Sequence, residues 1–269
     1  MPNLEVNRCN FYYEESGSGP ELVFIHGESH GIEYFEYQFQ EFSKDHRCFM
    51  YYRRGHGKTE FTSYGYSLEN QTRDLLMLLD ALNMAHPVIV GVAFGNTVAS
   101  NFAIKYPSRV KALVMESWLE IQGPDYPSGI NIWPQKTPML IRVYQKEGRE
   151  GFVNYLLREG KNVFQVVPSD TKIKEKFARM FANRPAEAYD KMNEFGSSVP
   201  NLIGQFHQVK VPVLGICGQN DPYPDRPELL NDMPNFREVF VPNAERFVHW
   251  EQPKEFNKIL HEFLMSVES

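Results

Sequence analysis

The chain lacks the features of several protein classes. It has only three cysteines, Cys9, Cys48 and Cys217, an odd number without regular spacing. This pattern predicts buried free thiols and argues against a disulfide framework or a cysteine-based metal site. No apolar run reaches the roughly 18 residues that a membrane span needs. The first residues show no signal-peptide pattern, so we expect a reduced, cytoplasmic protein without a membrane partner.

Long blocks of one charge are also missing. The formal net charge is −6, and the 28 basic and 34 acidic residues are spread along the chain. The basic pair Arg53-Arg54 is too short to form the patch that nucleic acid requires. We therefore expect a small-molecule partner and no nucleic acid, no cofactor and no metal ion, in a protein that is a monomer or a homodimer.

What the chain does contain is a regular alternation of apolar runs and helical patterns. ELVFIHG (21–27), HPVIVG (86–91) and RVKALVMES (109–117) have the composition of buried strands. Strands that are apolar on both faces and separated by helices are typical of parallel sheets. We predict an α/β fold with a mostly parallel sheet of eight strands and helices on both faces.

The alternation stops in the middle of the chain. A proline- and glycine-rich stretch after residue 118 is followed by helical patterns around 138–160 and 171–195. The strand pattern resumes at VPVLGICG (211–218). We therefore expect residues 1–117 and 207–269 to form the α/β core, with residues 118–206 inserted as a helical lid.

The most informative absence is that of a nucleophile at residue 93. Gly91-Val92-Ala93-Phe94-Gly95 follows an apolar strand pattern and precedes a helical one. This spacing predicts a sharp strand-to-helix turn, which displays a nucleophile and needs small residues two positions before and after it. The first turn of the helix favours a developing negative charge there. Ala93 occupies the display position and carries no hydroxyl group.

A strand that ends in His26-Gly27 predicts a second part of such a site. In the loop that follows, the backbone amide of Glu28 can point at the same oxygen as the amide of Phe94. We expect these two amides to form an oxyanion hole. The His26 side chain is expected to orient its loop rather than to react.

A carboxylate and an imidazole come later in the chain. Asp221 follows the strand that ends near residue 217 and is the predicted carboxylate, with Asp225 and Glu116 as alternatives. His249 lies between the last strand and the last helix and is the predicted base. A carboxylate at the carboxyl edge of the sheet can hold an imidazole in the required tautomer.

The order of elbow, acid and base along the chain resembles that of the α/β-hydrolase fold family. Three further stretches are similar to this family, RRGHGKT (53–59), YPSRVKALVMES (106–117) and HWEQPKEFNKILHEFL (249–264). The last resembles lid-bearing members such as enol-lactone hydrolases and meta-cleavage-product hydrolases. The resemblance implies a serine hydrolase that cleaves a small to medium hydrophobic or aromatic ester or lactone through an acyl-enzyme.

Ala93 departs from the pattern of that family, and three explanations are open. The chain is an inactive variant in which alanine replaces serine, an enzyme whose reaction needs no nucleophile, or a non-catalytic receptor for a small molecule. The other site residues are all present, which favours the first explanation. Hydrolysis of a C–C bond in a diketone would use the same residues and is a further alternative.

The lid segment is rich in aromatic residues. We expect a mostly apolar pocket above the elbow, lined by Trp118, Trp133 and Trp250. Arg53 is a candidate anchor for a substrate carboxylate.

Overall fold

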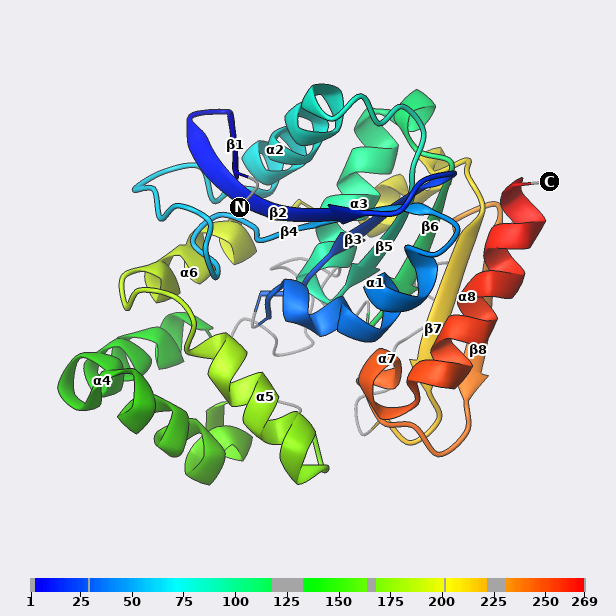
Figure 1. Cartoon of the computed structure of the whole chain (residues 1–269). Helices are drawn as coiled ribbons and strands as arrows, with labels where there is room; N and C mark the ends of the chain where they lie inside the picture. The colour runs from blue at the N-terminus through cyan, green and yellow to red at the C-terminus, as the bar shows by residue number, and fades with distance from the viewer. Residues whose placement is uncertain are drawn as a thin grey trace.

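The structure is a computed structural model that describes residues 3–28, 30–117, 133–163, 168–200, 202–221 and 231–268. Eight strands form one sheet in the order β1-β2-β4-β3-β5-β6-β7-β8 (Figure 1). The strands are β1 (Asn3–Val6), β2 (Cys9–Ser16), β3 (Glu21–Ile25), β4 (Arg47–Tyr51), β5 (Val88–Val92), β6 (Ala112–Glu116), β7 (Val213–Gly218) and β8 (Phe236–Val241). Strands β3 to β8 pair in parallel, and β1 and β2 are antiparallel. The predicted mostly parallel, eight-stranded sheet is confirmed.

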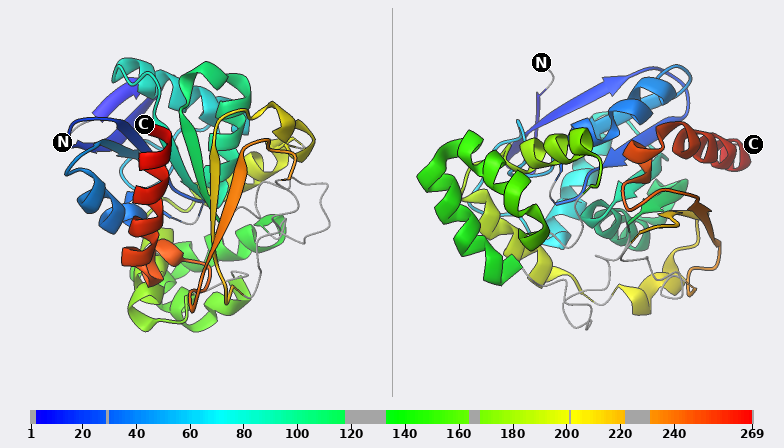
Figure 2. Two further views of the ribbon diagram at one scale, coloured as in Figure 1. Left: turned by 90° about the vertical axis from the view of Figure 1, so that its right-hand side faces the viewer. Right: turned by 90° about the horizontal axis from the view of Figure 1, so that it is seen from below.

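The described helices cover both faces of this sheet. They are η1 (Ile32–Phe35), α1 (Glu36–Phe42), α2 (Leu68–Ala81), α3 (Phe94–Lys105), η2 (Pro107–Arg109), α4 (Trp133–Val163), α5 (Thr171–Phe181), α6 (Ala188–Ser198), η4 (Ile203–Gln208), α7 (Val248–Glu251) and α8 (Pro253–Glu268). Helices α2 and α3 lie on one face, and α1 and α8 lie on the other (Figure 2).

Strand β3 shows why the sheet needs helices on both sides. Leu22 and Phe24 belong to the core beneath α1 and α8, whereas Val23 and Ile25 belong to the core beneath α2 and α3. Successive side chains of a strand point to opposite faces, so a continuous apolar run is buried only when both faces are covered.

Helix α2 begins directly after Ser67, a residue type that is favoured at a helix N-cap. The Ser67 hydroxyl accepts a hydrogen bond from the amide of Asn70 at 3.3 Å, which caps the first turn. Leu75, Leu78 and Leu79 are buried against the sheet.

Helices α4, α5 and α6 are inserted between β6 and β7, and the described residues between 118 and 206 contain no strand. In Figure 1 these helices lie together below the sheet, toward the ends at which β7 and β8 finish. The predicted helix over 171–195 is two helices, because the ring of Pro185 is incompatible with the carbonyl of Phe181 in a continuous helix. That these helices form a lid over residues 118–206 remains a prediction.

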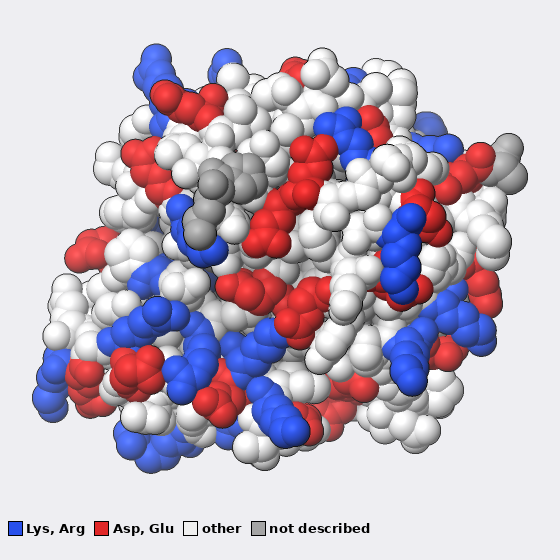
Figure 3. All heavy atoms as spheres, viewed as in Figure 1, with Lys and Arg blue, Asp and Glu red and all other residues white. Residues whose placement is uncertain are grey.

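The three cysteines are buried and free, as predicted. Burial raises the pKa of Cys9 and Cys48 to about 12, so both thiols are uncharged at neutral pH. None of the described helices combines the length and apolar character needed to cross a bilayer. On the face shown in Figure 3, acidic and basic side chains are interspersed.

Candidate active site

Ala93 lies at a strained turn between β5 and α3. Its backbone has φ 53° and ψ −124°, a region that side-chain-bearing residues rarely adopt. A Cβ atom on Gly95 would lie 2.0 Å from the carbonyl oxygen of Ile25, and one on Gly91 would lie 2.8 Å from the Asn96 side chain. The prediction that this turn needs small residues on both sides is confirmed.

Glu116 joins this turn to the neighbouring strand. It is the register partner of Val92, because β6 pairs directly with β5. Its carbonyl oxygen accepts hydrogen bonds from the amide of Ala93 at 3.0 Å and from the side chain of Asn96 at 2.6 Å. The end of β6 is therefore tied to the elbow by the backbone of Glu116.

The carboxylate of Glu116 holds His249. Its Oε2 lies 2.6 Å from His249 Nδ1, and its Oε1 accepts the His249 amide at 3.2 Å. Both side chains are buried. A carboxylate at Nδ1 favours the tautomer with the proton on that nitrogen, which leaves the lone pair on Nε2. His249 Nε2 is buried and has no hydrogen-bond partner among the described residues.

The prediction that Asp221 orients His249 is wrong. The Asp221 carboxylate lies 3.0 Å from Arg246 in a buried ion pair. Asp221 follows β7, which is one strand farther from β5 than β6 is. Glu116 therefore reaches the imidazole beside the elbow, and Arg246 pairs with Asp221. The third candidate, Asp225, lies outside the described residues.

The loop after β3 passes directly beside the elbow. A Cβ atom on Gly27 would lie 2.9 Å from the Cβ of Ala93. The backbone amides of Glu28 and Phe94 have no acceptor among the described residues. Phe94 is the first residue of α3, where helix geometry leaves the amide without an intrahelical partner. This arrangement is compatible with an oxyanion hole made by these two amides.

The side chain of Glu28 is held beneath this loop by two arginines. Its carboxylate lies 2.7 Å from Arg53 and 3.3 Å from Arg184, and 3.4 Å from His56. Burial alone would raise the pKa of Glu28, but the positive charge of Arg53, together with His56 and Arg184, outweighs it and holds the pKa well below its ordinary value. The carboxylate is therefore ionised and paired.

His26 orients the same loop, as predicted. Its Nε2 accepts the amide of Arg53 at 3.0 Å, and its Nδ1 lies 2.7 Å from the carbonyl oxygen of Gly27. Burial, His56 and Arg53 together lower the pKa of His26, so the ring is neutral.

The expectation that Arg53 anchors a substrate is wrong, because its side chain is buried and occupied. Its Nη2 pairs with Glu28, its Nε donates to Gln71 at 2.8 Å, and its guanidinium lies 4.9 Å from the ring centre of Phe195. Arg53 is 1% exposed, so its side chain supports the loop from inside the protein and does not face a substrate.

Of the three tryptophans predicted to line the pocket, the structure describes the side chain of Trp250 alone. Trp250 is buried among aromatic rings, 4.3 Å from Tyr34 and 5.5 Å from His249 between centroids. It therefore packs around the imidazole that Glu116 holds. Trp118 and the side chain of Trp133 lie outside the described residues.

His30 is a site residue that the sequence interpretation missed. It is buried beside Ala93 and stacks on Tyr34 with ring centroids 3.9 Å apart. A late strand and a helix flank His249, whereas His30 lies in an irregular loop. Its position three residues after Gly27, in the loop that passes the elbow, is the signal that could have identified it.

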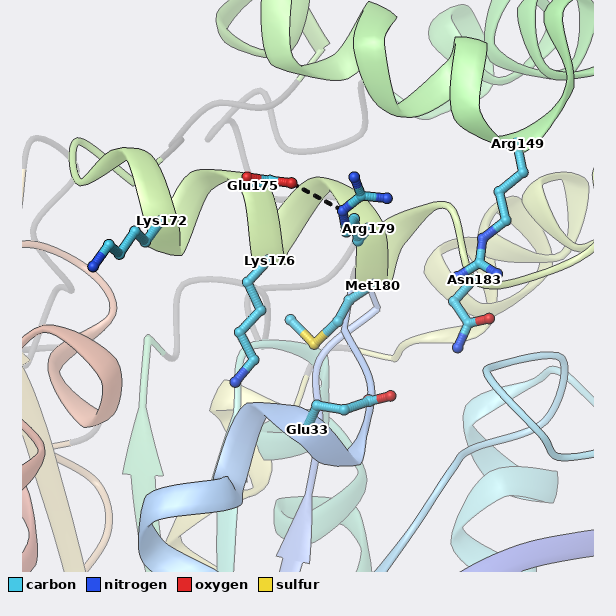
Figure 4. A pocket seen from close by; sticks show the side chains of 8 residues that line it. All are labelled: Glu33, Arg149, Lys172, Glu175, Lys176, Arg179, Met180 and Asn183. Atoms are coloured by element: carbon cyan, nitrogen blue, oxygen red, sulfur yellow. Dashed lines mark hydrogen bonds and ion pairs between the residues drawn. The ribbon is translucent and has the colours of Figure 1, made fainter.

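A separate pocket of about 370 Å³ lies between η1 and helices α4 and α5 (Figure 4). Its lining residues are Glu33, Arg149, Lys172, Glu175, Lys176, Arg179, Met180 and Asn183. Lys176 pairs with Glu36, and Arg179 pairs with Glu175. This pocket is lined mostly by charged residues and contains none of the elbow residues. Among the described residues, no group of histidine, cysteine and acidic side chains could hold a metal ion.

Comparison with known proteins agrees with this geometry. Residues 20–141 match the family described as alpha/beta hydrolase fold. A Bacillus subtilis strain 168 protein, provisionally named 2-succinyl-6-hydroxy-2,4-cyclohexadiene-1-carboxylate synthase, is 29% identical and aligns over 95% of each chain.

Solved structures extend the similarity to the whole chain. A structure from a study of carboxylesterases of the thaumarchaeon Nitrososphaera gargenis has a TM-score of 0.81 at 23% identity and covers 99% of both chains. The enol-lactonase from Burkholderia xenovorans LB400 has a TM-score of 0.77 at 20% identity, covering 98% of this chain and 100% of its own. With the elbow and the sheet order, these matches show that the chain has the α/β-hydrolase fold.

Proposed function

We propose that this site is built to hydrolyse a small to medium hydrophobic or aromatic ester or lactone, and that the active form carries serine at position 93. The observation that carries the proposal is the buried Glu116–His249 pair, with a 2.6 Å contact, tied to the elbow through the Glu116 carbonyl. The enol-lactonase and the structure from the carboxylesterase study share this fold, which supports ester and lactone chemistry.

In the proposed reaction, the serine hydroxyl attacks the substrate carbonyl while His249 Nε2 takes its proton. Glu116 stabilises the imidazolium that forms. The amides of Glu28 and Phe94 hold the negative oxygen of the tetrahedral intermediate. The imidazolium then protonates the leaving oxygen. A water molecule, deprotonated by the same nitrogen, finally releases the acid and regenerates the serine.

Ala93 itself cannot form an acyl-enzyme, so a second candidate function is base catalysis without a covalent step. Among the described residues His249 Nε2 has no partner, although Glu116 ties its side chain to the elbow, and this favours the second function. In that case the imidazole would deprotonate a water molecule or the substrate directly. Cleavage of a C–C bond in a diketone would also use this base.

The substitution Ala93→Ser distinguishes these functions. We expect it to produce a burst of p-nitrophenol from p-nitrophenyl acetate, followed by steady turnover, because the acyl-enzyme forms before it is hydrolysed. Ala93→Gly is the matched control, since it tolerates the strained turn and also lacks a hydroxyl. No turnover of esters or lactones by a folded serine variant would contradict the hydrolase proposal. Equal turnover by the alanine and serine forms would favour the reaction without a nucleophile.

A further inference from the structure

Three buried histidine nitrogens near the elbow have no hydrogen-bond partner among the described residues. They are Nδ1 and Nε2 of His30 and Nε2 of His249. A buried polar atom without a partner costs about 1–3 kcal/mol, so such atoms are rare unless a ligand satisfies them. The catalytic scheme above accounts for His249 and leaves His30 without a role.

His30 lies against the reacting position. A Cβ atom on Gly27 would be 2.5 Å from His30 Nδ1 and 2.9 Å from the Cβ of Ala93. Both groups therefore pack against the same side of Gly27, which puts His30 Nδ1 close to the Ala93 methyl group. His30 and Ala93 are 6% and 7% exposed, whereas His249 is 0% exposed. A ligand that reaches Ala93 therefore also meets His30.

The surroundings of His30 determine what it can bind. Its ring stacks on Tyr34 and meets the edges of Phe177 and Phe247, at centroid distances of 5.4 and 6.1 Å. Burial, reinforced by His249, lowers the pKa of His30 well below its ordinary value, so the ring is neutral. A neutral imidazole offers one donor and one acceptor.

The arginines near His30 are already bonded to an acidic side chain. Arg184, the cation that faces His30, is paired with Glu28, and Glu28 is also paired with Arg53. His56, which also faces His30, has a pKa lowered by burial and by Arg184. Because both arginines are bonded to Glu28 and His30 is neutral, the two His30 nitrogens can hydrogen-bond an uncharged oxygen.

We infer that His30 is a second substrate-contacting residue, which hydrogen-bonds a hydroxyl or carbonyl oxygen next to the reacting carbonyl of an uncharged substrate. The inference rests on the proposed function, because it places the reacting carbonyl between Ala93 and the two amides. It narrows the substrate class to carbonyl compounds that carry an oxygen on the adjacent carbon, such as hydroxy ketones, hydroxy esters and hydroxy lactones. Aromatic contacts with Phe177 and Phe247 favour a flat substrate.

Two probes that differ by one hydroxyl group test this inference in the protein with Ala93. By calorimetry, we expect α-hydroxyacetophenone to bind about tenfold more tightly than acetophenone, the effect of one buried hydrogen bond. His30→Phe keeps a ring to stack on Tyr34 but removes both nitrogens, and we expect it to abolish this preference. Phe247→Leu is the control, because it changes the same aromatic shell without removing a polar atom and should retain the preference.

Three results would overturn the inference. These are equal binding of the two probes by the unsubstituted protein, a preference that survives in His30→Phe, and no binding of either probe at millimolar concentration. If His30→Phe does not fold, nitrogen NMR of the histidine rings in the unsubstituted protein replaces it. The His30 nitrogens must then shift with α-hydroxyacetophenone and not with acetophenone, and equal shifts would refute the inference. Ester hydrolysis by Ala93→Ser is measured separately, so the two proposals fail independently.

Discussion

Glu116 has two roles at the level of single residues, because its backbone and its side chain act at different places. The carbonyl oxygen holds the elbow, and the carboxylate holds His249. The fold therefore sets the distance between the elbow and the imidazole through one residue at the end of β6. A substitution that changes only the carboxylate should leave the turn intact.

We expect Glu116→Gln, made in the Ala93→Ser background, to lower kcat for p-nitrophenyl acetate by about a thousandfold or more. The amide can donate to Nδ1 and so favours the wrong tautomer of His249. Asp221→Asn is the matched control and should change kcat by less than about tenfold, because Asp221 pairs with Arg246. Steady-state assays on folded protein measure both. A larger loss in Asp221→Asn would contradict the assignment.

The elbow glycines give a prediction about stability. Gly95→Ala should lower the free energy of unfolding by about 3 kcal/mol or prevent folding, because its Cβ would lie 2.0 Å from the Ile25 carbonyl oxygen. Gly196→Ala, within helix α6, has no atom within 4 Å of the added carbon and should stabilise the protein by up to about 1 kcal/mol. Urea denaturation compares the two variants. Equal effects would mean that close packing at the elbow is unimportant.

Some site residues can be predicted from the sequence and others cannot, for a physical reason. Gly91 and Gly95 are predictable because the steric requirement lies within one turn. The choice between Glu116 and Asp221 depends on strand order and on the partner of Arg246, which are properties of the folded chain. His30 was missed because its unpartnered nitrogens become visible only when the loop packs beside Ala93.

At the level of elements, Arg184 connects the inserted helices to the loop after β3. It lies between α5 and α6, and its guanidinium donates to both the carboxylate and the carbonyl oxygen of Glu28. The guanidinium also lies over the rings of Phe181 and Tyr189. The position of the inserted helices is thereby coupled to the loop that carries the proposed oxyanion amide.

Arg184→Met should therefore loosen both elements. We expect faster amide hydrogen exchange in residues 182–198 and 26–31, and a loss of about 2 kcal/mol in the free energy of unfolding, since Arg53 still pairs with Glu28. Arg179→Met is the control, because the ion pairs of Arg179 with Glu150 and Glu175 are exposed. Unchanged exchange in the loop of Arg184→Met would show that the two elements are not coupled.

The positions of helices and strands can be predicted closely where the sequence pattern that determines them is local. The apolar runs at 21–27 and 109–117 contain β3 and β6, and the run at 86–91 covers all but the last residue of β5. The cap at Ser67 marks the start of α2. The inserted helices were predicted less well. The helical pattern over 171–195 continues across Pro185, and amphipathic spacing alone does not reveal that the chain turns there to bring Arg184 to Glu28.

At the level of the whole molecule, three histidines make stability depend on pH. Burial lowers the pKa of His26, His30 and His56 in the folded protein. The unfolded chain, with ordinary pKa values of about 6.5, therefore binds more protons below that pH. The contribution to stability is complete above about pH 6.5 and is lost as the pH falls from there toward the folded pKa values.

We therefore expect the free energy of unfolding to fall between about pH 6.5 and about pH 5, by at most about 1.4 kcal/mol per pH unit for each histidine. Urea titrations at several pH values measure this slope. His30→Phe should reduce this slope by the contribution of one histidine. A flat profile in this range would mean that the folded and unfolded proteins bind equal numbers of protons, and so would contradict the lowered pKa values.

The central claim is that Glu116 holds His249 at the elbow, and low-field proton NMR of histidine-labelled protein tests it without a substrate. We expect a hydrogen-bonded Nδ1 proton of His249 at low field in the protein with Ala93. Glu116→Gln should remove or strongly shift this resonance, and Asp221→Asn should leave it in place. A resonance that survives in Glu116→Gln and disappears in Asp221→Asn would contradict the account.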